Sequence, residues 1–483
     1  MISLKIYLTL KSFSDQDLKK FEKFASSKFS NGRDLSGLVR VFRSLTANIS
    51  ERTTNKEFIS LISEKLKLKY SVVSNRLSDL NKLVEYFLLL KISDIEKVKK
   101  NFLLLEFHVK EKNFNPFDSL FFELEDMILK NKYDFLSLEN LSRLYESAAV
   151  KAFQTNNYQK YLEFNEKKND YRIANFISDF LRSTVEIHQQ DFYNKKTGSN
   201  YSIFENKIEF TEFINRFKNR DVKAYYLMQI LYYNYMSFTN QDKISFYKKA
   251  KKMHKQGYKY FNAELNNFLY FMNINYCIHK INLNQAEFYN EVFQIINAKL
   301  KDNLFFELRD PNHNANSFRS YINIGLRLNK YKWVNDFIEK YEKYLPAKNR
   351  NDDRNLNKGK LMVCKGEYIK AFEFLNSVKK TNFFYYSDCS FLKIRAFFSL
   401  GKFNEALEET ARLKSYISYH NDIPDFYYKK IVNHSKDSFM LIKYKTDSIS
   451  SEDLHFYFSE RKFPLVQDWI LDTVKSIQLK KNN

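Results

Sequence analysis

The phrase NKYKWV at residues 329–334 recurs, with variations, as GEYIKA at residues 366–371 and GKFNEA at residues 401–406. The three copies begin 37 and 35 positions apart, close to the period of about 34 residues found in repeats built from two helices. Each copy has a turn-forming Asn or Gly first, an aromatic residue third and Val or Ala sixth. We therefore expect tandem helical hairpins in this part of the chain.

Composition favours the same all-α class. The 483 residues include 8 Gly and 5 Pro, too few for the many tight turns of a sheet-rich protein. Hydrophobic residues make up 44% of the chain, with 47 Phe and 34 Tyr, so most of its length can form a packed core. The length exceeds one ordinary core and predicts several domains or one continuous array.

Tetratricopeptide repeats are the family that residues 315–420 resemble. That family has a helix, a turn carrying G-x-Y/F-x-x-A, a second helix and a terminating Pro. Here Ala371 and Ala406 occupy the small position and Pro346 follows the second helix of the first copy, where Asn329 replaces Gly. The layout is also similar to that of uncharacterised bacterial repeat proteins. The resemblance implies an α-solenoid of TPR-like helical hairpins and no particular activity.

The whole chain divides into four expected parts, none separated by a Gly/Ser-rich or Pro-rich linker. They are an N-terminal helical domain (1–92), a divergent array of helical hairpins (93–310), TPR-like repeats (311–440) and C-terminal capping helices (441–483). Residues 156–161, NNYQKY, are a looser copy of the repeated phrase. Loops are predicted at residues 194–202, 309–317, 346–355 and 445–453.

If the copies keep the register of the family, the first helix of each hairpin lines a concave groove. The inward positions are then Arg319, Asn323 and Arg327 in the first hairpin, Lys360 in the second, and Phe391, Arg395 and Phe398 in the third. Spacings of three and four put each set on one helical stripe. Four cations among aromatic rings suit an acidic peptide or a C-terminal carboxylate. The alternative is that these abundant cations face solvent without a partner.

The net charge of +22 and the pI of about 9.4 would attract nucleic acid or anionic lipid without a specific site. Lys far outnumbers Arg, whereas bidentate recognition of phosphate and guanine favours Arg. An AT-rich genome also explains the joint abundance of Lys, Asn, Ile, Phe and Tyr. We interpret the charge chiefly as compositional bias.

Residues 62–80 are the one local signal for nucleic-acid binding, because they resemble a helix-turn-helix. The residues near the start of its second helix that would contact DNA are Ser71, Ser74, Asn75 and Arg76. Lys67 stands where the turn of this motif usually has Gly. The alternative is an N-terminal structural cap whose apolar stripe packs on the array.

Motifs that carry chemistry are missing from the sequence. There is no GxGxxG, HExxH or GxSxG, and the 8 His are scattered. The close pair Cys277 and His279 lies in an apolar stretch, where core packing is the expected role. We therefore predict that the protein is not an enzyme and has neither a catalytic residue, a metal nor a cofactor.

The expected location is the cytoplasm. Three Cys at wide spacing form no disulfide framework, the first residues lack the pattern of a good signal peptide, and no apolar run reaches the roughly 18 residues of a membrane helix. We predict no contact with a membrane.

The sequence thus predicts a non-catalytic scaffold that binds a protein or acidic peptide through a helical-repeat groove. The alternative is a regulator or nucleic-acid-associated protein that uses residues 62–80 and the basic surface. The sequence does not indicate which oligomeric state the protein has.

Overall fold

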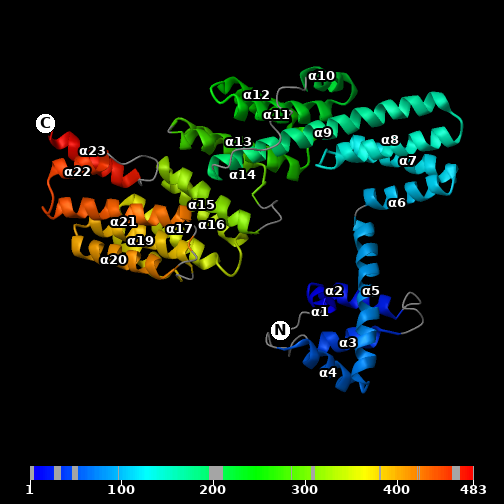
Figure 1. Ribbon diagram of the computed structural model, residues 1–483, viewed down its shortest axis with the longest axis horizontal. Helices are drawn as coiled ribbons and strands as arrows, with labels where there is room; N and C mark the ends of the chain where they lie inside the picture. The colour runs from blue at the N-terminus through cyan, green and yellow to red at the C-terminus, as the bar shows by residue number, and fades with distance from the viewer. Residues whose placement is uncertain are drawn as a thin grey trace. The chain divides into compact units, whose positions relative to one another are not determined.

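A computed structural model describes residues 5–26, 34–45, 53–95, 97–194, 210–283, 285–305, 311–379, 382–420, 423, 425–459 and 468–481. Over these residues the regular elements are 23 α-helices and two short 3-10 helices, without a β-strand (Figure 1). An isolated β-bridge joins Tyr133 and Phe261. The predicted all-α class is confirmed.

The chain forms two compact units. One contains Met1–Asn131 and Glu139–Tyr171, and the other contains Lys132–Leu138 and Arg172–Asn483. This division differs from the four parts expected from the sequence, whose boundaries remain a prediction.

The first five helices of the first unit enclose a hydrophobic core that includes Phe21, Val39, Phe58 and Val73. Two of the helices begin at a capping side chain: Ser14 accepts a hydrogen bond from the Asp17 amide, and Thr54 forms a reciprocal capping box with Glu57. Such caps satisfy amides that the first turn of a helix leaves unpaired. The helices are α1 (Lys5–Lys11), α2 (Asp15–Ala25), α3 (Ser36–Leu45), α4 (Asn55–Leu66) and α5 (Tyr70–Ile95).

Longer helices follow in the next part of the chain. Phe121, Tyr145 and Phe164 pack together at ring-centroid distances of 5.6 to 6.3 Å, which joins three of these helices. Because aromatic residues are modest helix formers, contacts of this kind stabilise the helices more than intrinsic propensity does. The helices are α6 (Lys97–Lys110), α7 (Phe114–Lys130), α8 (Ser137–Gln154) and α9 (Tyr158–Asn194).

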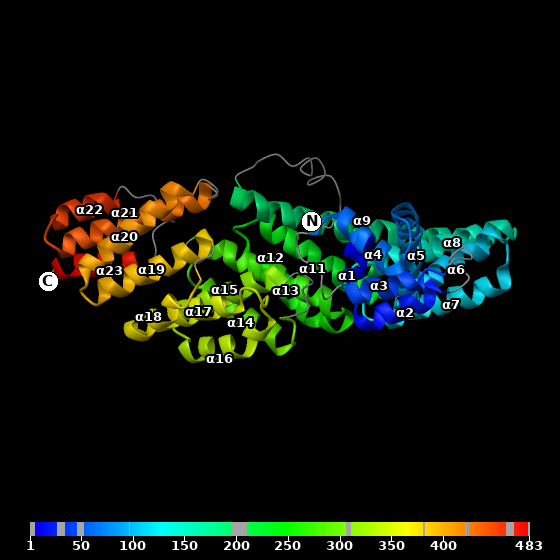
Figure 2. The ribbon, with the colours of Figure 1, turned by 90° about the horizontal axis from the view of Figure 1, so that it is seen from below.

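The second unit continues as consecutive helices that pack in neighbouring pairs (Figure 2). Odd-numbered helices also pack on one another, since α15 contacts α17, α17 contacts α19 and α19 contacts α21. The helices are α10 (Phe210–Arg220), α11 (Val222–Thr239), α12 (Ile244–Gly257), α13 (Ala263–Asn282), α14 (Phe288–Lys301), α15 (Pro311–Arg327), α16 (Tyr331–Tyr341), α17 (Arg350–Lys365), α18 (Tyr368–Asn376), α19 (Phe383–Ser399), α20 (Phe403–Tyr419), α21 (Asp425–Lys445), α22 (Ser451–Ser459) and α23 (Asp468–Lys481). The 3-10 helices are Tyr258–Tyr260 and Glu342–Tyr344.

The three copies of the repeated phrase share one turn geometry. Asn329, Gly366 and Gly401 have positive φ angles of 57°, 80° and 71°. The residue after each one donates its amide to a carbonyl five positions earlier, which is the Schellman way of ending a helix. These hydrogen bonds are Lys330 to Gly325 (2.8 Å), Glu367 to Met362 (2.9 Å) and Lys402 to Phe397 (2.9 Å).

The same turn recurs outside the repeated phrase. Lys112, Asn156 and Asn303 have φ angles of 54°, 57° and 57°, and the residue after each donates to the carbonyl five positions earlier. Asn156 opens the looser copy at 156–161, so that copy shares the turn of the better ones. Asn tolerates this left-handed conformation better than most residues with a Cβ atom.

The small residues of the phrase allow close packing between paired helices. Ala371 and Ala406 are fully buried. A Cβ atom on Gly359 of α17 would lie 2.6 Å from Cδ2 of Leu375 in α18 and 3.6 Å from the Ala371 carbonyl oxygen. Gly359 is therefore required where these two helices meet.

Two of the four predicted loops are wrong in part, because helices begin inside them. Helix α15 begins at Pro311 and α17 at Arg350, since Asn and Asp are tolerated in the first turn of a helix. The loop predicted at 445–453 is close to the observed connection, because α21 ends at Lys445 and α22 begins at Ser451. The remaining predicted loop is at 194–202, and its residues 195–202 lie outside the described residues.

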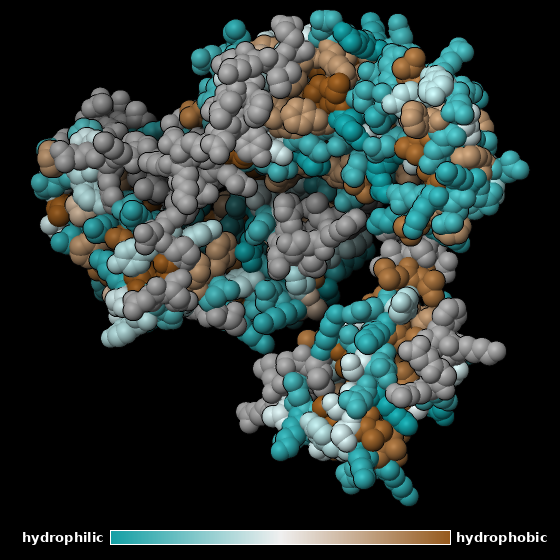
Figure 3. Space-filling view, turned by 45° about the vertical axis from the view of Figure 1, so that its right-hand side comes forward, coloured by the Kyte–Doolittle hydropathy of each residue, from teal (hydrophilic) through white to brown (hydrophobic). Residues whose placement is uncertain are grey.

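Among the described helices, none is long and apolar enough to cross a membrane. The face seen in Figure 3 is mostly hydrophilic, with hydrophobic side chains in small groups. Hydrophilic side chains on the outer faces of the helices are consistent with cores formed between helices.

Candidate functional site

A cavity of about 720 Å³ lies in the second unit, between helices that are widely separated in the sequence. Its lining comes from α13, α15, α17, α19, α21 and α23, with additions from α14 and the start of α16. Helices α15, α17 and α19 are the first helices of the three repeat copies, and they supply most of the lining.

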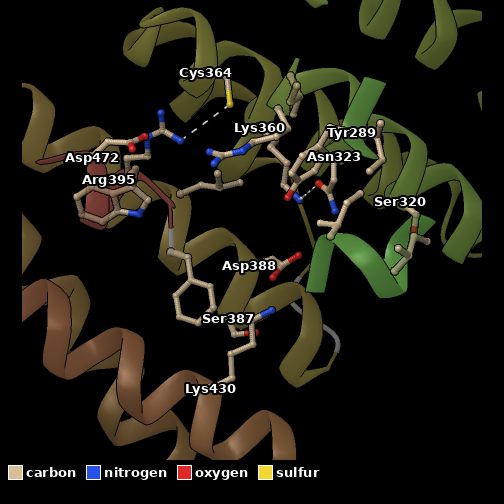
Figure 4. A pocket seen from close by; sticks show the side chains of 18 of the residues that line it. Tyr289, Ser320, Asn323, Lys360, Cys364, Ser387, Asp388, Arg395, Lys430 and Asp472 are labelled. Carbon is tan, nitrogen blue, oxygen red and sulfur yellow. Dashed lines mark hydrogen bonds between the residues drawn. The ribbon is translucent and has the colours of Figure 1, made fainter. Parts of the chain in front are cut away.

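Five of the seven residues predicted to line a groove lie in this cavity. They come from three helices and are Asn323, Arg327, Lys360, Phe391 and Arg395. The spacing of the repeats thus brings together residues up to 72 positions apart in the chain. Figure 4 shows Asn323, Lys360 and Arg395 around the cavity.

Arg319 does not belong to the described lining of the cavity, although it shares the stripe of Asn323. Its Nε donates to Oδ1 of Asp353 at 2.8 Å, and its Nη2 donates to the Tyr385 hydroxyl at 3.0 Å. The guanidinium also stacks on the Phe384 ring at 4.6 Å. Bound in this way, Arg319 joins three helices and lies outside the described lining of the cavity, and its role in binding a partner stays a prediction.

Phe398 is also outside the described lining. Its ring packs against Phe403 and Trp469, both at 5.7 Å between centroids, in the core that joins α21, α22 and α23. Phe398 lies one turn beyond Arg395 on α19, where the C-terminal helices cover the repeat.

Two cations of the cavity, Lys360 and Arg395, make only weak contacts with the described residues. Lys360 Nζ donates to Oδ1 of Asn323 at 3.1 Å, and Arg395 Nη1 lies 4.0 Å from the sulfur of Cys364 (Figure 4). Neither Lys360 nor Arg395 has an ion pair with another described residue. Arg327 lies over the Tyr289 ring at 5.7 Å. Lys360 and Arg395 are partly exposed, and cations with such weak partners can bind an incoming anion at a low desolvation cost.

Several lining residues carry no signal in the sequence. They are Lys430 and Tyr427 of α21, Asp388 of α19, and Trp469 and Asp472 of α23. No copy of the repeated phrase precedes α21 or α23, so their register could not be read. With Lys430 the lining has four cations, and Asp388 and Asp472 are its two carboxylates, which leaves an excess of positive charge.

The buried thiol of Cys277 is poorly suited to act as a nucleophile. Cys277 is fully buried, and its thiol donates to the Tyr247 hydroxyl at 3.4 Å. Burial raises the pKa of the Cys277 thiol to about 12, so the reactive thiolate is scarce at neutral pH. His279 is also buried, and burial lowers the pKa of its ring. In the described part of the chain, no cluster of three His, Cys, Asp or Glu could hold a metal.

The residues of the helix-turn-helix alternative lie at the start of α5. Ser71 and Asn75 are exposed, whereas Ser74 and Arg76 are partly buried. Lys67, which ends α4, has a φ of 53°, the left-handed conformation for which Gly is usually chosen at this turn. Leu68 donates its amide to the Ser63 carbonyl at 3.0 Å, so this is the same helix-ending turn as in the repeat copies and is not specific to a helix-turn-helix.

Comparisons with protein-family models, with curated proteins and with solved structures found no match to this chain.

Proposed function

We propose that this protein is a non-catalytic interaction scaffold, an α-solenoid of TPR-like hairpins whose cavity binds an acidic segment of a protein partner. The observation that carries the proposal is the convergence of Arg327, Lys360 and Arg395 from three successive first helices on one cavity. Aromatic rings beside these cations provide apolar contact for the peptide. Cations and rings together can bind a carboxylate and the side chain next to it.

A panel of fluorescent peptides of matched length and graded charge tests this proposal. Acidic peptides should raise the fluorescence anisotropy on adding the full chain, and basic peptides should not. Replacing Lys360→Glu and Arg395→Glu together should weaken binding by about tenfold or more, because attraction becomes repulsion.

Matched controls use exposed lysines outside the cavity. Lys332→Glu and Lys402→Glu change the net charge equally and should leave the affinity nearly unchanged. Equal losses in both pairs of variants would mean that general charge attracts the peptide, and the groove proposal would then be abandoned.

A second candidate function is duplex DNA binding through α4 and α5, supported by the exposure of Ser71 and Asn75 near the start of α5. Asn75→Ala with Ser71→Ala in the full chain should weaken a salt-dependent gel shift of duplex DNA, because both side chains are exposed near the start of α5. Absence of a shift at low salt would eliminate this candidate.

A further inference from the structure

Three residues that line the cavity occupy the same position in the three copies of the repeat. Asn323, Lys360 and Arg395 each lie six residues before the first residue of a copy of the repeated phrase. They come from α15, α17 and α19, and we call these three residues the repeat row. Because α15 packs on α17 and α17 packs on α19, the repeat row crosses the first helices one after another.

The two cations of the repeat row reach in the same direction. Lys360 Nζ of α17 donates to Asn323 of α15 at 3.1 Å, and Arg395 Nη1 of α19 lies 4.0 Å from the sulfur of Cys364 in α17 (Figure 4). Each cation thus reaches toward the preceding first helix. Their charges are therefore separated by about the distance between the axes of two packed helices, which is roughly 8–10 Å.

A peptide in the polyproline II conformation presents side chains at this separation. It has about three residues per turn and rises about 3.1 Å per residue, so residues i and i+3 lie on the same side about 9 Å apart. In a β-strand, residues on the same side are about 7 Å (i and i+2) or about 13 Å (i and i+4) apart. In an α-helix, residues i and i+7 lie about 10.5 Å apart. The separation of the cations therefore disfavours a β-strand, and other features of the cavity distinguish polyproline II from a helix.

The Asn323 side chain favours an extended partner over a helical one. Its Oδ1 accepts the hydrogen bond from Lys360, whereas its Nδ2 has no hydrogen bond to a residue that the structure describes. This Nδ2 is therefore available to donate to a backbone carbonyl of the partner. A polyproline II backbone leaves its carbonyls unpaired, while an α-helix pairs most of its own carbonyls internally.

Aromatic rings in the lining favour the same conformation. Four rings of the cavity are at least partly exposed, those of Tyr289, Tyr331, Phe384 and Tyr427. The Tyr331 hydroxyl donates to the backbone carbonyl of Cys364 at 3.1 Å, and the sulfur of Cys364 is the atom that Arg395 approaches. Aromatic side chains beside a groove are the usual binding site of polyproline II segments.

We propose that the segment bound in the cavity adopts the polyproline II conformation and carries acidic residues three positions apart. This inference rests on the proposed function, the binding of an acidic segment. One carboxylate pairs with Lys360 and the other with Arg395, so that successive repeats each bind one acidic residue. The cavity then selects the spacing of the acidic residues in addition to their charge.

Fluorescence anisotropy with the full chain and short peptides of equal length tests the spacing. Each peptide carries two Glu in a Ser background, placed two, three, four or seven positions apart, so that the net charge is constant. The spacing of three should give an affinity about fivefold or more above the others, because only this peptide reaches both cations in the bound conformation. Pro-Pro between the two Glu should bind more tightly than Gly-Gly, because proline favours polyproline II before binding.

A double-mutant cycle assigns each carboxylate to one cation. In the peptide with a spacing of three, each Glu is replaced in turn by Gln, and the affinity for the Lys360→Gln and Arg395→Gln variants is measured. Each Glu should couple by about fivefold with one cation and hardly at all with the other. Lys332→Gln changes an exposed residue outside the described lining and should couple with neither Glu. Circular dichroism of each variant verifies that it is folded.

The outcomes separate this inference from the proposed function. Equal affinity for all four spacings, or the tightest binding at a spacing of two, four or seven, would overturn the inference and leave the binding of acidic segments in place. Weaker binding of the Pro-Pro peptide than of the Gly-Gly peptide would also overturn it. If no acidic peptide binds, the proposed function and the inference both fail.

Discussion

The guanidinium of Arg319 in α15 donates through Nε to Oδ1 of Asp353 in α17 at 2.8 Å and through Nη2 to the Tyr385 hydroxyl of α19 at 3.0 Å. Its side chain is 18% exposed and that of Asp353 is 1% exposed. One arginine thus links three successive first helices. Burial raises the pKa of Asp353, and the charge of Arg319 opposes this increase.

Arg319→Ala should lower the free energy of unfolding by about 3–5 kcal/mol, because it leaves a buried carboxylate without its counterion. Urea unfolding followed by circular dichroism measures the loss. Replacing both partners, Arg319→Met with Asp353→Leu, should recover much of it, since no buried charge then remains. A single variant as stable as the wild type would show that the pair contributes little.

Gly359→Ala should destabilise the protein by about 1–3 kcal/mol, which is typical of overpacking in a core. The added Cβ would lie 2.6 and 2.8 Å from Cδ2 and Cγ of Leu375, so the Leu375 side chain or the helices must shift. Gly37→Ala is the matched control, because its Cβ would meet Cδ2 of Leu66 at 4.0 Å. Helix propensity should make this control neutral or slightly stabilising. Thermal melting of both variants distinguishes the two effects, and equal melting temperatures would contradict the close approach of α17 and α18.

Two buried histidines should make stability fall in mild acid. Burial lowers the pKa of His254 to about 4 and that of His434 to about 3, whereas an unfolded His has a pKa of about 6.5. Below about pH 6.5 the unfolded chain therefore binds protons that the folded chain does not, and the free energy of unfolding decreases until the pH reaches the folded pKa. The loss is about 1.4 kcal/mol per pH unit for each histidine.

Urea midpoints at about pH 7.5 and 5.5 measure this decrease. A variant with His254→Asn and His434→Asn should show a smaller decrease between the two pH values. His455→Asn removes an exposed histidine and should behave as the wild type. An unchanged decrease in the double variant would assign the acid sensitivity to other groups.

Lys299→Met should stabilise the protein at pH 7 by about 1–3 kcal/mol, because it removes a buried charge. Lys299 is 1% exposed, its Nζ donates to the Tyr321 hydroxyl at 3.1 Å, and no described carboxylate lies within ion-pair distance of it. Burial lowers the pKa of Lys299 to about 8. The wild type should therefore gain stability between about pH 8 and 10, where the unfolded lysine still binds a proton and the folded one loses it.

Urea unfolding at about pH 7 and 9.5 compares the two proteins, and the advantage of Lys299→Met should shrink at the higher pH. Lys301→Met replaces an exposed lysine of the same helix and should change stability by less than about 0.5 kcal/mol. A destabilised Lys299→Met variant would show that the Tyr321 hydrogen bond outweighs the cost of burying the charge.

The sequence by itself determined the helical class, the spacing of the repeat turns and the stripes on which Asn323, Arg327, Lys360 and Arg395 lie. Local physics suffices there, because Gly and Asn end helices in a left-handed turn and residues three or four apart share a face. The tertiary structure decided which cations remain open to a partner. Arg319 shares the stripe of Asn323, yet Asp353, 34 positions away, binds its guanidinium. Lys430, from a helix without the repeated phrase, lies in the cavity. Such pairings depend on how successive helices pack, which no local pattern encodes.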